Sequence, residues 1–367
     1  QLESITSWAV NHEPSPMPFL KKLITENYTV QNFFANSCET IKAEFSSLCS
    51  FYPSSPGPIS EFYTNNNYYC LPELLKNEFN YESHIYHANS NKFWERNILS
   101  PKWGIQNNHF SPEFQVRESD YQVLERLAND LSTRKEPSFN YFISFTSHSP
   151  HNQLYIDNYN LENGNSPDIK LYNPPINPNI LKNIEIKEKT IRPYLSQLAA
   201  VDQSLEHFFY KLKKYNLLNK SIIIIYSDHR YYKFLPDDKL ENFYNYNKLP
   251  FVMVLPEKNK IKLQNIASHI DIAPTILDLL KYKKKLPTNF IGTSLFSPNH
   301  PNYEINKCLN QIIYIDNNIL IKGNAENTMY NISHLFNKDI NFYSYIPALS
   351  EYIELSDKIL KENKLGK

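Results

Sequence analysis

The chain has 367 residues, 41% of them hydrophobic, which is enough for a sizeable core in one large domain or two average ones. Its 38 basic side chains balance 38 acidic ones and form no basic stripe, so no nucleic-acid partner is expected. With only 6 glycines against 24 prolines, the chain has no glycine-rich phosphate loop, which argues against P-loop and dinucleotide-binding sites.

No apolar run approaches ~18 residues, so we expect neither a membrane span nor a signal peptide in the sequence as given. The chain opens at Gln1-Leu2-Glu3 with no capping residue and no preceding strand. We therefore expect it to be part of a longer protein whose N-terminal portion is absent, and to be soluble as given.

The four cysteines, Cys38, Cys49, Cys70 and Cys308, lack the CxxC spacing of a zinc knuckle or a redox site. Cys38 and Cys49 could form a disulfide, which would fit an oxidising compartment, or remain a reduced, buried pair. The spacing leaves both alternatives open.

Residues 1–150 alternate helical and extended patterns. We predict helices over 16–25, 40–47, 70–79 and 120–133. We predict strands over 28–34, 81–88 and 140–146. Thr40 therefore falls at a helix N-terminus, where free N–H groups and the helix dipole favour an anionic group.

The second half of the chain begins with an Asn- and Pro-rich stretch, 151–190, which predicts a long loop. Beyond it we predict helices over 190–218, 271–280 and 343–360, strands over 222–225, 249–255, 312–315 and 319–321, and a loop over 231–247. The pattern changes near residue 300. We therefore divide the chain into a main domain, residues 1–298, and a small C-terminal subdomain, residues 299–367.

The stretch SIIIIYSDHR, residues 221–230, combines an apolar run with polar residues directly after it. Its isoleucine run indicates a strand buried on both faces, as in the centre of a parallel sheet. Asp228 and His229 follow directly, at the edge where open α/β sheets bind ligands. A carboxylate and an imidazole there are suitable ligands for a divalent metal.

The repeated order of strand, loop and helix predicts an α/β fold with a doubly wound, mostly parallel sheet flanked by helices, followed by a small α+β subdomain. Polar side chains cluster after the strands, and one hydroxyl lies at a helix start. We expect them to share one edge of the sheet: Glu3, Thr40, His87, His148, Asp228 and His229.

These motifs resemble the extracellular domain of lipoteichoic acid synthases and related phosphoglycerol transferases, in the alkaline phosphatase/sulfatase superfamily. The resemblance spans residues 2–297 and implies that superfamily's fold for the main domain. It rests on Leu2-Glu3-Ser4, Pro18-Phe19-Leu20, ETIKAEF at 39–45, HANSNKFWER at 87–96, FTSHSP at 145–150, SDH at 227–229, HIDIAPTILDLL at 269–280 and IGTSL at 291–295.

The resemblance implies one divalent ion, Mn²⁺ or Mg²⁺, bound by Glu3, Asp228, His229 and the Thr40 oxygen. Thr40 is then the nucleophile, because a coordinated hydroxyl has a lowered pKa. The alternative for Thr40 is a plain helix cap.

The same resemblance implies a substrate site. Arg96 is its candidate phosphate clamp, since a planar guanidinium suits two oxygens. Trp94 would pack against a glycerol or sugar face, or belong to the core. His148 would contact the phosphate or carry a proton, and His87 would orient Arg96 or a ligand.

Two departures from the family pattern concern the site. Ser227 stands where the family has Gly, and Ser37-Cys38-Glu39 replaces a glycine-rich approach to the nucleophile. The cysteines that flank Thr40, Cys38 and Cys49, are more similar to phosphoethanolamine transferases. The motifs therefore indicate the superfamily more specifically than they indicate the group that is transferred.

We expect a metal-dependent phosphotransferase that moves a phosphoglycerol-type or phosphoethanolamine-type group, through a phospho-Thr40 intermediate, onto an extracytoplasmic glycopolymer or glycolipid. The alternatives are a phosphodiesterase or sulfatase-like hydrolase of the same fold and a non-catalytic glycan- or lipid-binding member. The expected partners are an anionic phospholipid headgroup or a phosphorylated glycan. The expected location is extracytoplasmic, at the cell membrane, with membrane proximity supplied by the absent N-terminal region.

Overall fold

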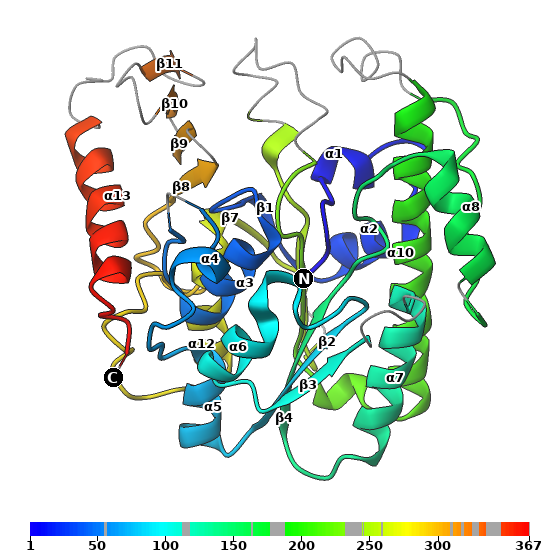
Figure 1. Cartoon of the computed structure of the whole chain (residues 1–367), viewed down its shortest axis with the longest axis horizontal. Coiled ribbons are helices and arrows are strands. Elements are labelled where there is room, and N and C mark those ends of the chain that lie inside the picture. Colours follow the sequence, from blue (N-terminus) through cyan, green and yellow to red (C-terminus); the bar gives the residue numbers. More distant parts are fainter. Residues whose placement is uncertain are drawn as a thin grey trace. The chain divides into compact units, whose positions relative to one another are not determined.

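The computed structural model describes residues 1–54, 57–111, 118–162, 164–176, 188–231, 244, 246–257, 260–308, 311–316, 319–324, 330–334 and 346–366 (Figure 1). The chain divides into two compact units. The first comprises Gln1–Val30, His84–Phe93 and Asn107–Leu263, and the second comprises Gln31–Ser83, Trp94–Gln106 and Gln264–Lys367. Parallel and antiparallel strands alternate with helices along the chain, as expected for an α/β protein.

Three of the boundaries between the two units fall within strands, namely β1 (Tyr28–Phe34), β2 (Glu82–His87) and β7 (Lys262–Ser268), and another falls within the short helix at Phe93–Glu95. The first unit also contains the strands β3 (Asn107–Phe110), β4 (Ser138–Ile143), β5 (Ile223–Tyr226) and β6 (Phe251–Val254). Its helices are α1 (Ser7–Val10), α2 (Pro18–Glu26), α7 (Asp120–Thr133), α8 (Gln153–Glu162), α10 (Glu188–Lys214) and the short η2 (Leu218–Lys220).

Strand β5 lies at the end of a sheet with the order β5-β6-β1-β7, and it pairs antiparallel with β6. The prediction of a central strand in a parallel sheet was therefore wrong in this detail. Ile222 is 37% exposed, and within β5 only Ile225 and Tyr226 are buried. A run of isoleucines has the same appearance in a central and in an end strand, so composition could not separate the two.

The first residues of the chain lie beside β5. Leu2 forms a parallel bridge with Ser227, just after the strand. The backbone nitrogen of Gln1 donates to the carbonyl of Phe142, in β4, at 2.8 Å. Strand β4 belongs to the sheet of order β3-β2-β4, in which β2 and β3 are parallel. Residues 1–3 therefore connect the end of β5 to β4 through backbone hydrogen bonds.

The core of the first unit packs α10 against α2 and α7, and Figure 1 shows α7 and α10 side by side. Asp202, within α10, fixes the start of α2. Its carboxylate oxygens accept hydrogen bonds from the backbone N–H groups of Phe19 and Leu20, each at 2.8 Å. These groups have no partner within a helix, so Asp202 caps α2 from a neighbouring helix. Asp202 thus has the structural role that its place within a long helix indicates.

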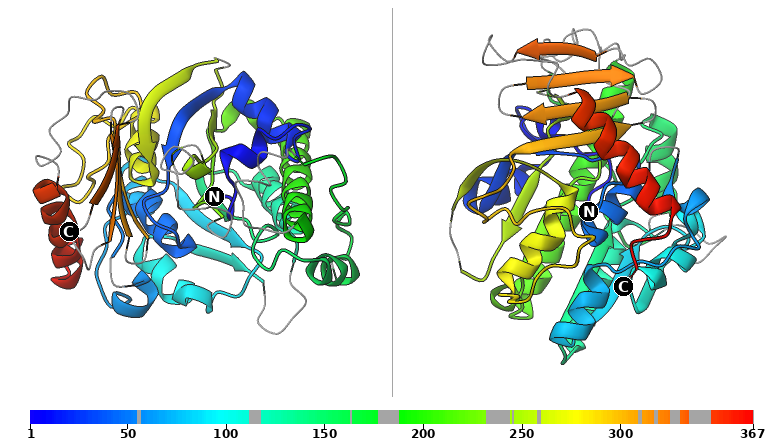
Figure 2. Two further views of the ribbon diagram at one scale, coloured as in Figure 1. Left: turned by 90° about the horizontal axis from the view of Figure 1, so that it is seen from above. Right: turned by 90° about the vertical axis from the view of Figure 1, so that its left-hand side faces the viewer.

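The second unit contains the helices α3 (Thr40–Cys49), α4 (Ile59–Phe62), α5 (Leu71–Phe79), α6 (Arg96–Lys102), α12 (Ile272–Leu279) and α13 (Ile346–Lys361), preceded in two places by the short η1 (Phe93–Glu95) and η4 (His269–Asp271). Its strands are β8 (Tyr303–Cys308), β9 (Gln311–Asp316), β10 (Ile319–Asn324) and β11 (Tyr330–His334). They form an antiparallel sheet in the order β11-β10-β9-β8, and α13 runs beside it (Figure 2). The proposed division at residue 298 stays a prediction.

Two disulfides join segments of the second unit. Cys38 pairs with Cys308, and Cys49 pairs with Cys70. Both alternatives that the spacing left open, a Cys38–Cys49 bond and a reduced, buried pair, are thus wrong. Cys38 precedes α3 and Cys49 ends it, so the two cysteines lie at opposite ends of one helix and cannot reach each other.

The predicted loop over 151–190 contains a helix. Helix α8 occupies Gln153–Glu162, and α10 begins at Glu188. Leu154 and Leu161 of α8 are 67% and 84% exposed, so this helix has no apolar stripe that a periodicity search could detect. Residues 177–187, and most of the predicted loop over 231–247, lie outside the described residues.

Candidate metal centre and catalytic residues

The backbone of Glu3 is held by two hydrogen bonds, one at its N–H and one at its carbonyl. Its N–H donates to Ser144 Oγ at 2.7 Å, and its carbonyl accepts from Ser147 Oγ at 2.7 Å. Glu3 is 4% exposed. The two serines follow β4, so the carboxylate of Glu3 is held at the end of that strand.

Asp228 is anchored from the opposite side, after β5. Its Oδ1 accepts from the Ser4 N–H at 2.8 Å and from the His229 N–H at 2.6 Å. Ser4 has a φ of 54°, in the left-handed region that costs free energy for a residue with a side chain. This strained turn directs the N–H of Ser4 toward Asp228, and it also leaves the carboxylate of Glu3 close to Asp228.

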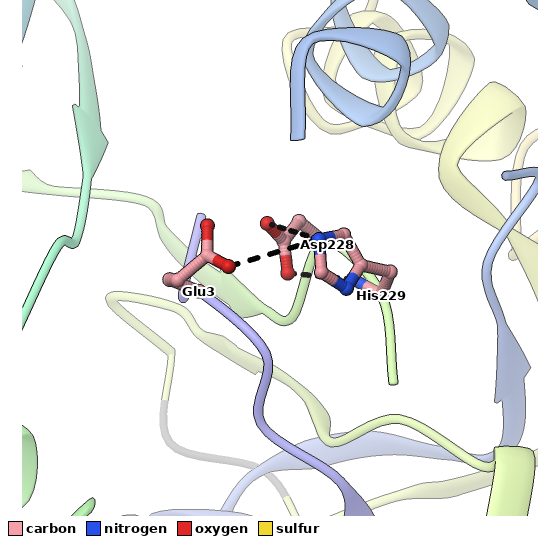
Figure 3. Close-up of side chains that lie close together, drawn as sticks. All are labelled: Glu3, Asp228 and His229. Carbon is pink, nitrogen blue, oxygen red and sulfur yellow. Dashed lines mark hydrogen bonds and ion pairs between the residues drawn. The ribbon is translucent and has the colours of Figure 1, made fainter. Parts of the chain in front are cut away.

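Glu3, Asp228 and His229 converge on one point, with one ligand atom from each lying within 4.8 Å of the others (Figure 3). His229 Nε2 lies 3.7 Å from Glu3 Oε1 and 3.4 Å from Asp228 Oδ2. Its other ring nitrogen, Nδ1, lies 2.9 Å from the Arg230 carbonyl. That contact favours a proton on Nδ1 and an acceptor lone pair on Nε2, which is the form that binds metals.

The carboxyls of Glu3 and Asp228 would repel each other if both were ionised without a bound cation. Burial opposes ionisation of Glu3, but His229, His148 and hydrogen bonds from neighbouring side chains together outweigh it and lower the pKa of Glu3 to about 2. Burial, and then the charge of Glu3, raise the pKa of Asp228 well above its usual range. Two buried carboxylates at this separation cannot both ionise without a nearby positive charge.

A divalent cation fits these residues. Asp228 Oδ2 is buried and accepts no hydrogen bond, which is costly for a carboxylate oxygen unless a cation or proton compensates it. Two carboxylates and one imidazole, all buried and within reach of one another, form a ligand set for such an ion. Glu3, Asp228 and His229, predicted as ligands, thus meet in space.

The loop after β4 carries His148. Asp120, in the first turn of α7, accepts from the N–H groups of Phe145 and Thr146 at 2.7 and 2.9 Å. The His148 ring stacks on the Phe145 ring, with 5.1 Å between the ring centres. His148 is close enough to lower the pKa of Glu3, although its effect is smaller than that of His229. His148 thus lies near Glu3.

Gln197, in α10, holds the same loop from the other side. Its Nε2 donates to the carbonyls of Thr146 and His148, each at 3.2 Å. Its Oε1 lies 2.5 Å from His151 Nδ1. Gln197 is fully buried, so these contacts fix the backbone of His148. His151 is 4% exposed, so its contact with Gln197 lies in the interior.

His87 ends β2, as predicted. Its Nδ1 lies 2.9 Å from the Ile143 carbonyl, and its ring contacts the edge of Phe145 at 5.7 Å. Phe145 thus contacts both His87 and His148. These contacts position the ring of His87 without showing a ligand for it.

Thr40, Trp94 and Arg96 belong to the second unit. Thr40 is the first residue of α3 and is 8% exposed. Glu39, before it, provides no side-chain cap. Arg96 begins α6 and is 1% exposed. Its Nε lies 3.2 and 3.1 Å from the two carboxylate oxygens of Glu44, and its Nη2 lies 2.5 Å from Oε1. Their roles stay predictions.

The comparisons with known proteins agree with this geometry. The family model described as Sulfatase matches residues 2–282. The chain belongs to the sulfatase family.

Several relatives of this sulfatase-family chain are synthases. The lipoteichoic acid synthase-like protein YvgJ of Bacillus subtilis (strain 168) is 24% identical over 393 aligned positions, which cover 99% of this chain and 59% of the relative. A lipoteichoic acid synthase of Staphylococcus saprophyticus is 26% identical over 327 positions, covering 82% of this chain and 47% of the relative. The chain thus spans about half the length of the curated relatives it matches.

Solved structures show the same fold. The lipoteichoic acid synthase LtaP from Listeria monocytogenes superposes with a TM-score of 0.79 at 20% identity, over 98% of this chain and 90% of that one. A protein of the alkaline phosphatase superfamily from Vibrio parahaemolyticus gives 0.75 at 17% identity, over 100% and 87%. The resemblance read from the sequence is confirmed at the level of family and fold.

The sulfatase-family motifs did not reveal the residues that hold the ligands. Ser227 was noted only as a departure from the family's Gly. Its Oγ accepts from the Ile5 N–H at 2.9 Å and lies 3.0 Å from the Leu2 carbonyl, so it fastens the segment that carries Glu3. Asp120 and Gln197 gave no signal, because a buried polar residue within a helix resembles any other in the sequence.

Proposed function

We propose that this chain is the catalytic part of a metal-dependent phosphotransferase that moves a phosphoglycerol-type group from a lipid donor to an acceptor hydroxyl. The observation that supports it most directly is the buried set of Glu3, Asp228 and His229, in which one oxygen of Asp228 accepts no hydrogen bond. Membership of the sulfatase family and the lipoteichoic acid synthase relatives support the choice of reaction.

Glu3, Asp228 and His229 would hold one divalent ion, Mn²⁺ or Mg²⁺. Bound there, such an ion would supply Lewis-acid stabilisation of negative charge and would lower the pKa of a coordinated hydroxyl. The imidazole of His229 favours Mn²⁺ over Mg²⁺, because Mg²⁺ prefers ligands that are all oxygen.

Thr40 is proposed as the nucleophile and as a further ligand, an assignment that rests on the ETIKAEF motif and on its place in the first turn of α3. The Thr40 hydroxyl loses its proton as its Oγ attacks the donor phosphorus, and the bond from phosphorus to the lipid oxygen breaks. The lipid oxygen takes up a proton and leaves as an alcohol. The acceptor hydroxyl then attacks phosphorus and loses its proton, the bond from phosphorus to Thr40 Oγ breaks, and Thr40 takes up a proton.

His148 is proposed as the group that carries protons between the leaving and entering oxygens, because its ring lies near Glu3 on a loop fixed by Asp120 and Gln197. Arg96 is proposed to bind phosphate oxygens, Trp94 to contact the glycerol and His87 to orient the bound group. Each of these roles follows the HANSNKFWER motif.

The proposed setting is the outer face of a cell membrane, with an anionic phospholipid headgroup or a phosphorylated glycan as partner. None of the helices in the described ranges has the length and apolar character to span a bilayer. The Cys38–Cys308 and Cys49–Cys70 disulfides support an oxidising compartment, since cytosolic thiols are normally kept reduced.

The test separates transfer from hydrolysis. The protein is incubated with Mn²⁺ and vesicles containing radiolabelled phosphatidylglycerol, with and without an acceptor alcohol, and the lipid and water-soluble products are analysed. The proposal expects label on the acceptor and release of diacylglycerol, both abolished by chelation. Free glycerol phosphate, unaffected by the acceptor, identifies a hydrolase. An untouched donor with Mn²⁺ bound or unbound rejects catalysis on this donor.

A further inference from the structure

Arg96 is held by a carboxylate that is not among the predicted site residues. Glu44 and Arg96 are fully buried, and both Nε and Nη2 of the guanidinium face the two oxygens of Glu44. This two-point contact fixes the plane of the guanidinium as well as its position, because both groups are planar. With a single hydrogen bond, the plane of the guanidinium could still rotate about that bond.

Stability alone gives a poor account of this pair. Removing two charges from water costs free energy that their attraction only partly returns, and a well-packed apolar pair of similar volume is often at least as stable. Helix α3 is buried along its whole length, so an apolar residue at position 44 would be shielded from water. The charge pair is better explained by the orientation that it gives to Arg96.

Glu44 lies on the same helix as Thr40, one turn further along. Residues four apart in an α-helix are neighbours on one face. Side chains on a helix also lean toward its N-terminus, so the carboxylate of Glu44 lies over the turn that begins with Thr40. Glu44 therefore fixes the guanidinium of Arg96 to the Thr40 face of α3.

The backbone that leads into Arg96 is strained. Trp94 and Glu95 have φ values of 60° and 50°, in the left-handed region, although neither is a glycine. Two consecutive residues in that region persist only where the surroundings impose them. The ion pair at Arg96 is an anchor directly after them, and Trp94 lies within the strained turn.

We propose that Glu44 is a positioning residue that sets Arg96 and, through the strained turn, Trp94 in place relative to the Thr40 face of α3. The role of Glu44 rests on the proposed function, in which Arg96 binds the phosphate that Thr40 attacks. Glu44 itself touches no substrate.

The test shortens the carboxylate without removing its charge. Glu44→Asp withdraws the acceptor by one methylene, and the matched control is Glu304→Asp. Glu304 is buried in the same unit and accepts a hydrogen bond from Asn36 Nδ2 at 2.6 Å, but it does not contact Arg96. We measure kcat and KM for the lipid donor, and the affinity for glycerol phosphate by calorimetry in a Thr40→Ala background.

We expect Glu44→Asp to lower kcat/KM about 10- to 100-fold, because a displacement near 1 Å is enough for such losses. It should weaken glycerol phosphate binding as well, whereas Glu304→Asp changes neither by more than about two-fold. In an Arg96→Gln background, Glu44→Asp should cause no further loss, since Glu44 acts through Arg96. If Glu44→Asp does not fold, Glu44→Gln is used, because it keeps the length and one acceptor oxygen.

Two negative results have different meanings. If the unaltered protein transfers the group and Glu44→Asp or Glu44→Gln retains its kcat/KM and affinity, the positioning role is rejected while the proposed function stands. Additive losses for Glu44→Asp and Arg96→Gln also reject it. If the unaltered protein neither binds glycerol phosphate nor turns over the donor, the proposed function fails, and the role of Glu44 fails with it.

Discussion

Asp228 Oδ1 accepts a hydrogen bond from the Ser4 N–H at 2.8 Å, which joins the first residues of the chain to the end of β5. The same bond aligns two of the candidate ligands, because Glu3 precedes Ser4. The candidate metal centre is therefore assembled by folding and is not contained in any short stretch of the sequence. The three candidate ligands and the residues that hold them can be altered one at a time.

Asp228→Asn should abolish stabilisation by Mn²⁺ while leaving the metal-free protein at least as stable. Burial and the charge of Glu3 raise the pKa of Asp228 well above its usual range, so a neutral amide suits the empty site. In the unaltered protein, Mn²⁺ at 100 times its Kd should add about 2.7 kcal/mol to the free energy of unfolding. Thermal unfolding with Mn²⁺ and with chelator measures both.

The control for that experiment is Asp202→Asn, which alters a buried carboxyl of the same unit that lies outside the ligand set. It should retain the full Mn²⁺ shift. A metal shift that survives Asp228→Asn, or one that Asp202→Asn also removes, would show that the ion does not bind at Glu3, Asp228 and His229.

The stability contributed by Asp202 should decrease as the pH rises. Burial raises the pKa of Asp202 from 3.8 to about 7, although hydrogen bonds from Leu20 and Phe19 oppose the shift. Between these values the folded state keeps a proton that the unfolded state has released, so raising the pH favours unfolding. Denaturant titrations at several pH values, compared with Asp202→Asn, isolate this group. A difference between the two proteins that is constant with pH would refute the assignment.

Gln197→Glu should impair turnover by disturbing His148. The substitution replaces the amide donor with a carboxylate oxygen that faces the carbonyls of Thr146 and His148, where it is repelled. We expect kcat to fall about 10- to 100-fold, because the proposed proton carrier is displaced.

The same substitution elsewhere provides the control. Gln122 closes a capping box with Ser119 at the start of α7, and Glu serves equally well in that position. Gln122→Glu should therefore leave kcat unchanged. Equal losses in the two variants, or no loss for Gln197→Glu, would remove the support for a positioned His148.

Peptide mapping without reduction should recover Cys38 linked to Cys308 and Cys49 linked to Cys70. Replacing both cysteines of the Cys49–Cys70 bond by Ser should lower the free energy of unfolding by about 2–5 kcal/mol, as expected for a native disulfide. Both cysteines are fully buried, so serine there also leaves polar groups in an apolar site. A Cys38–Cys49 peptide would disagree with the structure.

The sequence was sufficient for the elements with strong periodicity. The bounds of α7 and β1 were predicted without error, and α3 and α5 to within two residues. Thr40 was correctly placed at the start of a helix. Elements without a clear apolar pattern were missed, including α8 with its exposed leucines and β7, where polar residues alternate irregularly.

Of the candidate site, the sequence indicated Asp228 and His229 through their place after a predicted strand, and all three of Glu3, Asp228 and His229 through the resemblance to family motifs. It could not supply their supports. The left-handed φ of Ser4 and the hydroxyl of Ser227 depend on neighbours more than 200 positions away along the chain. The ion pair of Glu44 and Arg96 likewise joins α3 to α6. Such contacts arise from tertiary packing and leave no local pattern.

The most direct test of the central claim is the intact mass of the protein after incubation with Mn²⁺ and phosphatidylglycerol, beside a Thr40→Ala variant. The account predicts an adduct with the mass of a glycerophosphate group, located on Thr40 by fragmentation and absent from the variant. Steady consumption of the donor without any adduct, or an adduct that persists in Thr40→Ala, would contradict it.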